Sequence, residues 1–80
     1  MASARHVIVT GRVQGVGYRA WTVREARKLA LRGFVRNRQD GSVEILVMGE
    51  ASALERMIKA CHYGPPTSRV DTVTVAEAED

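Results

Sequence analysis

Residues 7–19 read VIVTGRVQGVGYR and join a β-rich run to a helical pattern through a glycine-rich turn. The β-branched residues of this stretch predict a strand that extends from Val7 to Val13. Apolar residues then recur at helical spacing, which predicts a helix over residues 19–32. Gly33 stands where a helix C-terminal glycine belongs. The apolar positions of this helix are Val23, Ala26, Leu29, Ala30 and Leu31.

A β-hairpin follows this helix. Residues 34–38 read as a strand. Side chains in residues 43–48 alternate in kind with a period of two residues, which predicts a second strand. Asp40 and Gly41 lie between them and predict a type I′ turn, which needs positive φ at both central positions. The two strands are therefore expected to pair directly.

A second helix and a last strand complete the chain. Ser52 and Glu55 have the spacing of a capping box, which predicts that a helix starts there. Gly64 and the two prolines after it end that helix. Residues 70–75 are rich in valine and predict a strand. The apolar stripe of the helix consists of Leu54, Met57, Ile58 and Cys61.

The element order is thus β-α-β-β-α-β. Its usual solution is a ferredoxin-like α+β fold, in which a four-stranded antiparallel sheet carries both helices on one face. Eighty residues leave room for one domain, and no linker or low-complexity segment interrupts them. We therefore expect a single domain over residues 1–80.

Composition narrows the class of protein. The net charge is +3, but the basic residues form no continuous run. Those that crowd the first predicted helix interleave with apolar positions as on a solvated helix face, which indicates attraction of small anions rather than a nucleic-acid partner. No segment approaches the roughly 20 apolar residues that span a bilayer, and residues 1–6 lack the apolar region of a signal peptide. The single cysteine, Cys61, cannot form an internal disulfide, which is typical of the reducing cytoplasm. We expect a cytoplasmic protein without membrane association.

The glycine-rich turn offers chemistry suited to an anion. A helix N-terminus leaves backbone N–H groups unpaired and carries a partial positive charge. Glycines let such a turn curl so that successive N–H groups point at one anion. Arg19 would add a fork of donors that matches phosphate oxygens. From these residues alone, a purely conformational turn with Arg19 paired to a surface carboxylate remains an equal alternative.

Asn37 is a second candidate. The first and second strands of a ferredoxin-like sheet run in the same direction, so the loop after Val13 and the end of the strand with Asn37 can meet. Asn37 shares a strand face with Val35, which we expect on the core side. Its uncharged amide could hold a water molecule. Taken alone, a turn-starting role for Asn37 is the better interpretation. His6 and His62 are too separated in sequence to suggest a metal site.

Three separated stretches give the sequence a family resemblance. Residues 11–19, 33–37 and 40–44, followed by the Gly-Pro-Pro at residues 64–66, closely resemble the acylphosphatases. The similarity covers nearly the whole chain. It implies the ferredoxin-like fold and a hydrolase that splits acyl phosphates into a carboxylate and inorganic phosphate, without metal or cofactor. Small acyl phosphates, with inorganic phosphate as product or inhibitor, are the ligands implied.

The resemblance also assigns the site. Arg19 would bind the substrate phosphate, and Asn37 would position the attacking water. Tyr18 and Phe34 replace a common phenylalanine and a common tryptophan of the family, which puts fine packing in doubt rather than activity. The backbone N–H groups that would complete the phosphate cradle belong to Gly15, Val16, Gly17 and Tyr18.

Two other functions remain open. A ferredoxin-like module could bind RNA or a small anion without catalysis, although the second strand offers only Phe34 for base stacking. The chain could also be part of a larger carbamoyl-transfer enzyme, which would require more chain than these 80 residues. Nothing in the sequence demands a partner subunit, so we expect a monomer.

Overall fold

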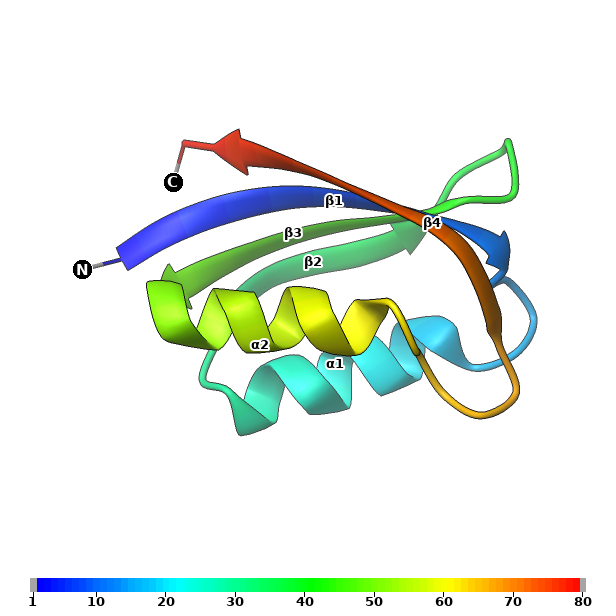
Figure 1. Ribbon diagram of the computed structural model, residues 1–80, viewed down its shortest axis with the longest axis horizontal. Helices are drawn as coiled ribbons and strands as arrows, with labels where there is room; N and C mark the ends of the chain where they lie inside the picture. Colours follow the sequence, from blue (N-terminus) through cyan, green and yellow to red (C-terminus); the bar gives the residue numbers. More distant parts are fainter. Residues whose placement is uncertain (1, 80) are drawn as a thin grey trace.

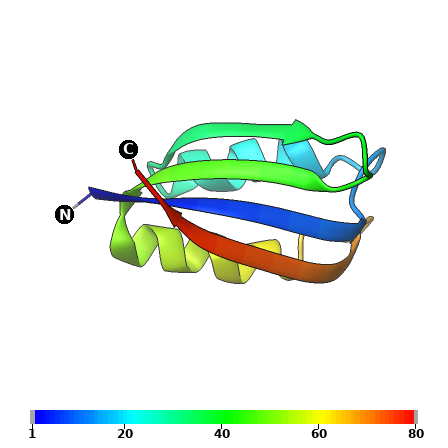
Figure 2. The same cartoon turned by 90° about the horizontal axis from the view of Figure 1, so that it is seen from above.

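The computed structural model describes residues 2–79 as one antiparallel sheet with two helices packed on it (Figure 1). The elements are β1 (Ala2–Arg12), α1 (Tyr18–Lys28), β2 (Arg32–Asn37), β3 (Val43–Glu50), α2 (Ala51–Cys61) and β4 (Arg69–Ala78). The strand order is β2-β3-β1-β4, and both helices cover the same face of the sheet (Figures 1 and 2). This confirms the predicted ferredoxin-like α+β fold. Within residues 2–79, no helix is long and apolar enough to cross a membrane.

The core lies between the sheet and the two helices. Alternate residues of β1 and β3 face it, and the register brings Val7 opposite Ile45 and Val9 opposite Val43. The predicted alternation along β3 is confirmed, because its odd-numbered residues from 43 to 47 are buried. The buried cluster consists of Val7, Val9, Val13, Tyr18, Leu31, Val43, Ile45, Val47, Leu54, Met57 and Cys61.

Helix α2 follows β3 without a loop. Its predicted apolar stripe is confirmed, since Leu54, Met57 and Cys61 are all buried. The predicted capping box is wrong: α2 begins at Ala51, so the N-cap position falls to Glu50 in an extended conformation. Ser52 therefore lies inside the first turn, where it cannot act as the cap. The direct connection from strand to helix moves the start by two residues.

Helix α1 is shorter than its sequence pattern predicts. It ends at Lys28, and Ala30 takes the left-handed conformation with φ of 57°. The N–H of Ala30 donates to Arg27 O at 3.1 Å and the N–H of Leu31 donates to Ala26 O at 2.9 Å, the two bonds of a Schellman motif. The predicted C-terminal role of Gly33 is therefore wrong. The expected apolar stripe is also partly wrong, because Thr22 is buried and Val23 is 37% exposed.

Gly33 belongs to strand β2 and has a φ of 138°. A Cβ added there would lie 1.8 Å from the backbone oxygen of Leu46, on the neighbouring strand β3. No side-chain rotation relieves a clash with backbone, so the glycine is required by close approach of two strands.

Gly33→Ala should therefore lower the free energy of unfolding by about 3 kcal/mol, measured by urea denaturation. Gly41→Ala is the matched control, because Gly41 also has positive φ, at 92°, but a Cβ there meets nothing within 4 Å. That control should cost only about 1 kcal/mol of conformational strain. Equal losses in the two variants would contradict the clash with Leu46.

The β2–β3 hairpin does not use a type I′ turn. Asp40 does not adopt positive φ, and among the non-glycine residues that the structure describes only Ala30 does. The N–H of Arg38 donates to Ser42 O at 2.8 Å, which leaves a three-residue loop with left-handed Gly41 at its third position. Asp40 contributes through its side chain, since its Oδ1 accepts from the Ser42 N–H at 2.9 Å and from the Ser42 hydroxyl at 2.5 Å. These hydrogen bonds hold the pKa of Asp40 below its usual value.

Candidate active site

The loop between β1 and α1 exposes a run of backbone donors. Gly15 and Gly17 have φ of 73° and 84°, and an added Cβ at either meets nothing within 4 Å. Conformation, rather than space, is therefore what requires glycine there. Gly17 is the N-cap of α1, and no side chain caps the helix. In the described part of the chain, the N–H groups of residues 15–19 donate to no backbone or side-chain acceptor.

The first hydrogen bond of α1 runs from the Trp21 N–H to Gly17 O at 3.0 Å. The donors before it belong to the helix N-terminus and to the curled loop, so they share the partial positive charge of the helix end. Such an arrangement is suited to an anion with several oxygens.

Arg19 extends from the first turn of α1. Its side chain is exposed and makes no hydrogen bond or ion pair with any residue between 2 and 79. The alternative in which Arg19 only serves a surface carboxylate therefore finds no support in this structure. The guanidinium lies at the same helix end as the loop donors and is available to an anionic ligand.

Asn37 is the last residue of β2. It lies opposite Val43, whose side chain is in the core, so Asn37 is at the end of the helix-covered face, as the alternation predicts. The Asn37 side chain is exposed, and no hydrogen bond ties it to another residue in the described range. An unengaged amide at this position can hold a small polar molecule.

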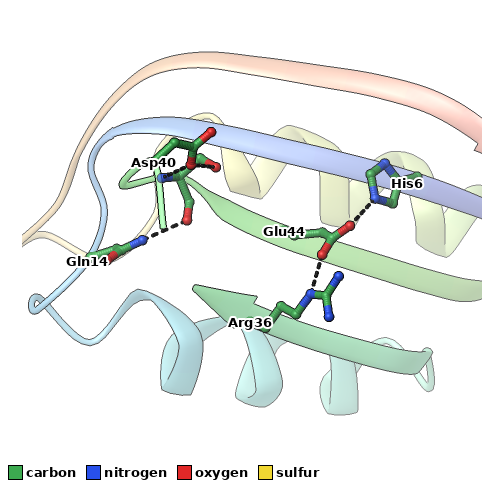
Figure 3. A network of polar contacts seen from close by, with 6 residues as sticks. His6, Gln14, Arg36, Asp40 and Glu44 are labelled. Atoms are coloured by element: carbon green, nitrogen blue, oxygen red, sulfur yellow. Dashed lines mark hydrogen bonds and ion pairs between the residues drawn. The ribbon is translucent and has the colours of Figure 1, made fainter. Parts of the chain in front are cut away.

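Gln14 connects the loop to the hairpin after Asn37. Its Nε2 donates to Arg38 O and to Ser42 O, each at 2.8 Å, and Figure 3 shows this side chain reaching toward the hairpin. The glycine-rich loop and the end of β2 are therefore held at the same end of the sheet. Sequence reasoning gave Gln14 no role, because its partners lie 24 and 28 residues further along the chain.

A second contact fixes the other side of the loop. The Thr67 hydroxyl donates to Val16 O at 2.6 Å, from the segment that connects α2 to β4. The carbonyl of Val16 therefore has a hydrogen-bond donor, while the N–H groups of residues 15–19 have no acceptor among the described residues. Sequence reasoning did not identify Thr67 either, and no local signal in the sequence points to it.

Tyr18 contributes to the loop with its backbone only. Its side chain is 1% exposed, and its hydroxyl donates to Cys61 O at 2.7 Å at the end of α2. Burial raises the pKa of Tyr18 above its usual value, and burial also raises the pKa of Cys61 to about 11. An uncharged Tyr18 therefore anchors the start of α1 on α2. Its ring also explains Gly64, where a Cβ would lie 2.6 Å from Tyr18 Cε2.

A separate polar network lies on the opposite face of the sheet. Glu44 accepts from His6 Nε2 at 2.7 Å and from Arg36 Nε, as Figure 3 shows. The hydrogen bond with His6, followed by the one with Arg36, lowers the pKa of Glu44. Glu44 follows core-facing Val43 in β3, so its carboxylate points away from the helices and from the face of Asn37.

A family model described as Acylphosphatase matches residues 5–80. The chain belongs to the acylphosphatase family. An acylphosphatase from Acidiphilium cryptum is 53% identical over 76 residues, which cover 95% of this chain and 84% of that protein. Another from Azoarcus is also 53% identical over 76 residues, covering 95% of this chain and 78% of the relative. Family membership implies a hydrolase whose substrate is a small acyl phosphate.

Solved structures of the family have the same fold. The crystal structure of acylphosphatase from Bacillus subtilis superposes with a TM-score of 0.94 at 44% identity and covers all of this chain and 88% of its own. A structure of full-length HypF in a phosphate- and nucleotide-bound form gives a TM-score of 0.93 at 34% identity. That match covers all of this chain but only 11% of HypF. The same domain thus also occurs within a much longer protein.

Losing the Gln14 amide should lower both stability and turnover. Gln14→Ala removes two hydrogen bonds, at a cost of about 1–2 kcal/mol in the free energy of unfolding. Because a small misplacement of reacting groups is costly, we expect kcat to fall about tenfold. Thr10→Val, which removes the hydrogen bond from Thr10 to Thr72 on the open face, is the control and should leave kcat unchanged. An unchanged kcat in Gln14→Ala would show that the loop needs no tether.

Proposed function

We propose that the protein hydrolyses acyl phosphates by direct attack of water on phosphorus, with the phosphoryl group held by Arg19 and the loop N–H groups. The observation that carries this proposal is the run of unengaged N–H groups over residues 15–19 beside a free guanidinium. These donors match the three oxygens of a phosphoryl group. They would neutralise the charge that is spread over those oxygens in the transition state.

Asn37 would orient the water. The proposal rests on its unengaged amide at the end of β2, and on the Gln14 bridge that holds this end beside the loop. The water oxygen forms a bond to phosphorus as the bond from phosphorus to the acyl oxygen breaks. The electron pair of that bond leaves with the carboxylate, and a phosphoryl oxygen takes the proton of the water. No covalent enzyme intermediate is involved.

The leaving group explains why so few side chains suffice. A carboxylate departs from a mixed anhydride as a weak base, so it needs little help from a general acid. Positioning and charge stabilisation are then the main tasks. We propose that Arg19 and the loop donors perform them without a metal or a cofactor.

The proposal extends to the location, oligomeric state and partners of the enzyme. We propose a cytoplasmic monomer that acts on free small molecules and has no nucleic-acid or membrane partner. Its single cysteine, Cys61, is fully buried in the core, which suits a protein that does not depend on disulfides. Sedimentation analysis of the purified protein would test the monomer.

Hydrolysis of benzoyl phosphate in the presence of EDTA tests the proposed reaction. We expect turnover that is unchanged by the chelator and is inhibited competitively by inorganic phosphate. A well-folded protein without turnover would overturn the assignment. Turnover that EDTA abolishes and a divalent cation restores would overturn the metal-free mechanism alone.

A further inference from the structure

Basic side chains gather on one side of the molecule, over α1 and β2. Residues 19–38 carry seven of the twelve Lys and Arg residues and only one of the nine acidic residues. All seven basic side chains are exposed. Because α1 packs beside β2 (Figures 1 and 2), these charges surround the edge of the sheet at β2, with those of α1 on the helix-covered side and Arg36 on the open face beside Glu44. Outside this segment, acidic residues outnumber basic ones.

An apolar groove runs between α1 and β2. It has a volume of about 200 Å³. The residues that face each other across it are small, with Thr22 and Ala26 on α1 and Gly33 on β2, so side chains do not fill the space. Exposed Val23 and half-buried Val35 give it apolar walls. The guanidinium-bearing residues Arg27 and Arg32 also line it.

Strand β2 is an edge strand. In the part of the chain that the structure describes, no strand pairs with its outer side, so its outward N–H and C=O groups are available. Phe34 is 47% exposed on this strand, with the Arg36 guanidinium 5.6 Å from its ring centroid. Backbone, apolar and cationic features thus lie side by side along about 20 Å of strand.

We propose that this side of the molecule binds an extended acidic segment of another protein, which adds to β2 as a further strand. Alternate side chains of the added strand would enter the groove and must therefore be apolar. The carboxylates that alternate with them would lie on the opposite face of the added strand, on the side of Arg32 and Arg36, and Arg27 beside the groove adds to the attraction of the negatively charged segment. Backbone hydrogen bonds supply affinity in this mode of binding, and the groove supplies selectivity.

The groove favours a peptide over a nucleic acid. A single-stranded nucleic acid is held by phosphate contacts and by stacking of its bases on several aromatic rings. Phe34 is the only aromatic residue in β2, and the groove beside it has apolar walls that a sugar-phosphate backbone cannot fill. A peptide with apolar and acidic residues can fill the groove, pair with the strand edge and neutralise the positive charge at the same time.

Binding of a model peptide tests the proposal. The probe is a fluorescently labelled, end-blocked octapeptide of alternating Val and Glu, measured by fluorescence anisotropy. We expect saturable binding that weakens with rising ionic strength, as binding between exposed charges does. Peptides in which Lys replaces Glu, or Ser replaces Val, should bind at least tenfold more weakly.

Matched protein variants locate the site. The double variant Arg27→Glu, Arg32→Glu should weaken peptide binding at least tenfold, and Val23→Asn should weaken it about threefold. Arg56→Glu, Lys59→Glu makes the same change of charge on exposed positions of α2 and should leave affinity within twofold. Circular dichroism establishes that each variant is folded. Amide hydrogen exchange with peptide present should slow in β2.

Several results would overturn the proposal. If no saturable binding is observed, the role of the arginines would be to prevent edge-to-edge aggregation at β2. If the α2 variant lost as much peptide affinity as the Arg27/Arg32 variant, the loss would be caused by the change of net charge and not by these two arginines. Tighter binding of a labelled octauridylate than of the Val/Glu peptide would make the surface a nucleic-acid site. Protection of β4 instead of β2 would place the peptide at the wrong edge. None of these measurements depends on the catalytic activity.

Discussion

Replacing Arg19 by alanine should lower kcat/KM for benzoyl phosphate about a thousandfold or more. An arginine that stabilises a phosphoryl transition state contributes on that scale, because its guanidinium offers charge and two directed N–H donors at once. The side chain is exposed and has no partner in the described part of the chain. Its loss should therefore leave the stability of the fold nearly unchanged.

Phosphate binding should be lost together with turnover in this variant. If Arg19 contacts the phosphoryl group in both the ground state and the transition state, the inhibition constant of inorganic phosphate must rise as well. Arg19→Lys keeps the charge but loses the planar fork, so we expect it to recover only part of the activity.

A matched variant tests whether the loss of one positive charge, by itself, explains the loss of kcat/KM in Arg19→Ala. Arg24→Ala removes another exposed arginine of α1, five residues further along the helix. We expect it to change kcat/KM no more than about threefold, through weaker attraction of the anionic substrate. Comparable losses in Arg19→Ala and Arg24→Ala would contradict the specific role of Arg19 and leave only the general field of the basic surface.

Replacing Asn37 by alanine should lower kcat about a hundredfold while phosphate inhibition changes no more than about threefold. The physical reason is that a water-orienting group acts on the nucleophile and not on the bound phosphoryl group. Steady-state kinetics with inorganic phosphate as inhibitor separates the two effects.

Two further variants sharpen this result. Asn37→Asp has the same size but would place a negative charge near the phosphoryl oxygens, so both turnover and phosphate binding should weaken. Gln39→Ala changes an exposed residue of the same hairpin and should have little effect. If Asn37→Ala weakened phosphate binding as much as turnover, Asn37 would be a phosphate ligand instead of a water-positioning residue.

Local errors in the sequence-based prediction have physical causes. The capping box of α2 and the C-terminal glycine of α1 were both wrong, because neighbouring segments displaced the helix ends. Strand β3 runs directly into α2, and Ala30 takes the left-handed position that was expected for Gly33. Gly33 is needed instead where β2 approaches Leu46 O. Local patterns could not show either event, because each depends on what the chain meets in space.

Local sequence patterns were enough to predict the element order and hence the fold. Alternation in β3, the stripe of α2 and the glycine-rich loop before α1 are consequences of backbone periodicity and of positive φ, which act over a few residues. The resemblance to acylphosphatases, carried by three separated stretches, gave the family. Arg19 and Asn37 were candidates from the sequence, and their roles remain proposals.

The contacts that join these parts depend on the packing of the whole chain. Gln14 reaches the carbonyls of Arg38 and Ser42, and Thr67 reaches the carbonyl of Val16 across 51 residues. The packing of α1 beside β2 creates the apolar groove that Arg27 and Arg32 line. Such contacts depend on strand order and register, which bring distant residues within hydrogen-bond distance. No local pattern contains that information.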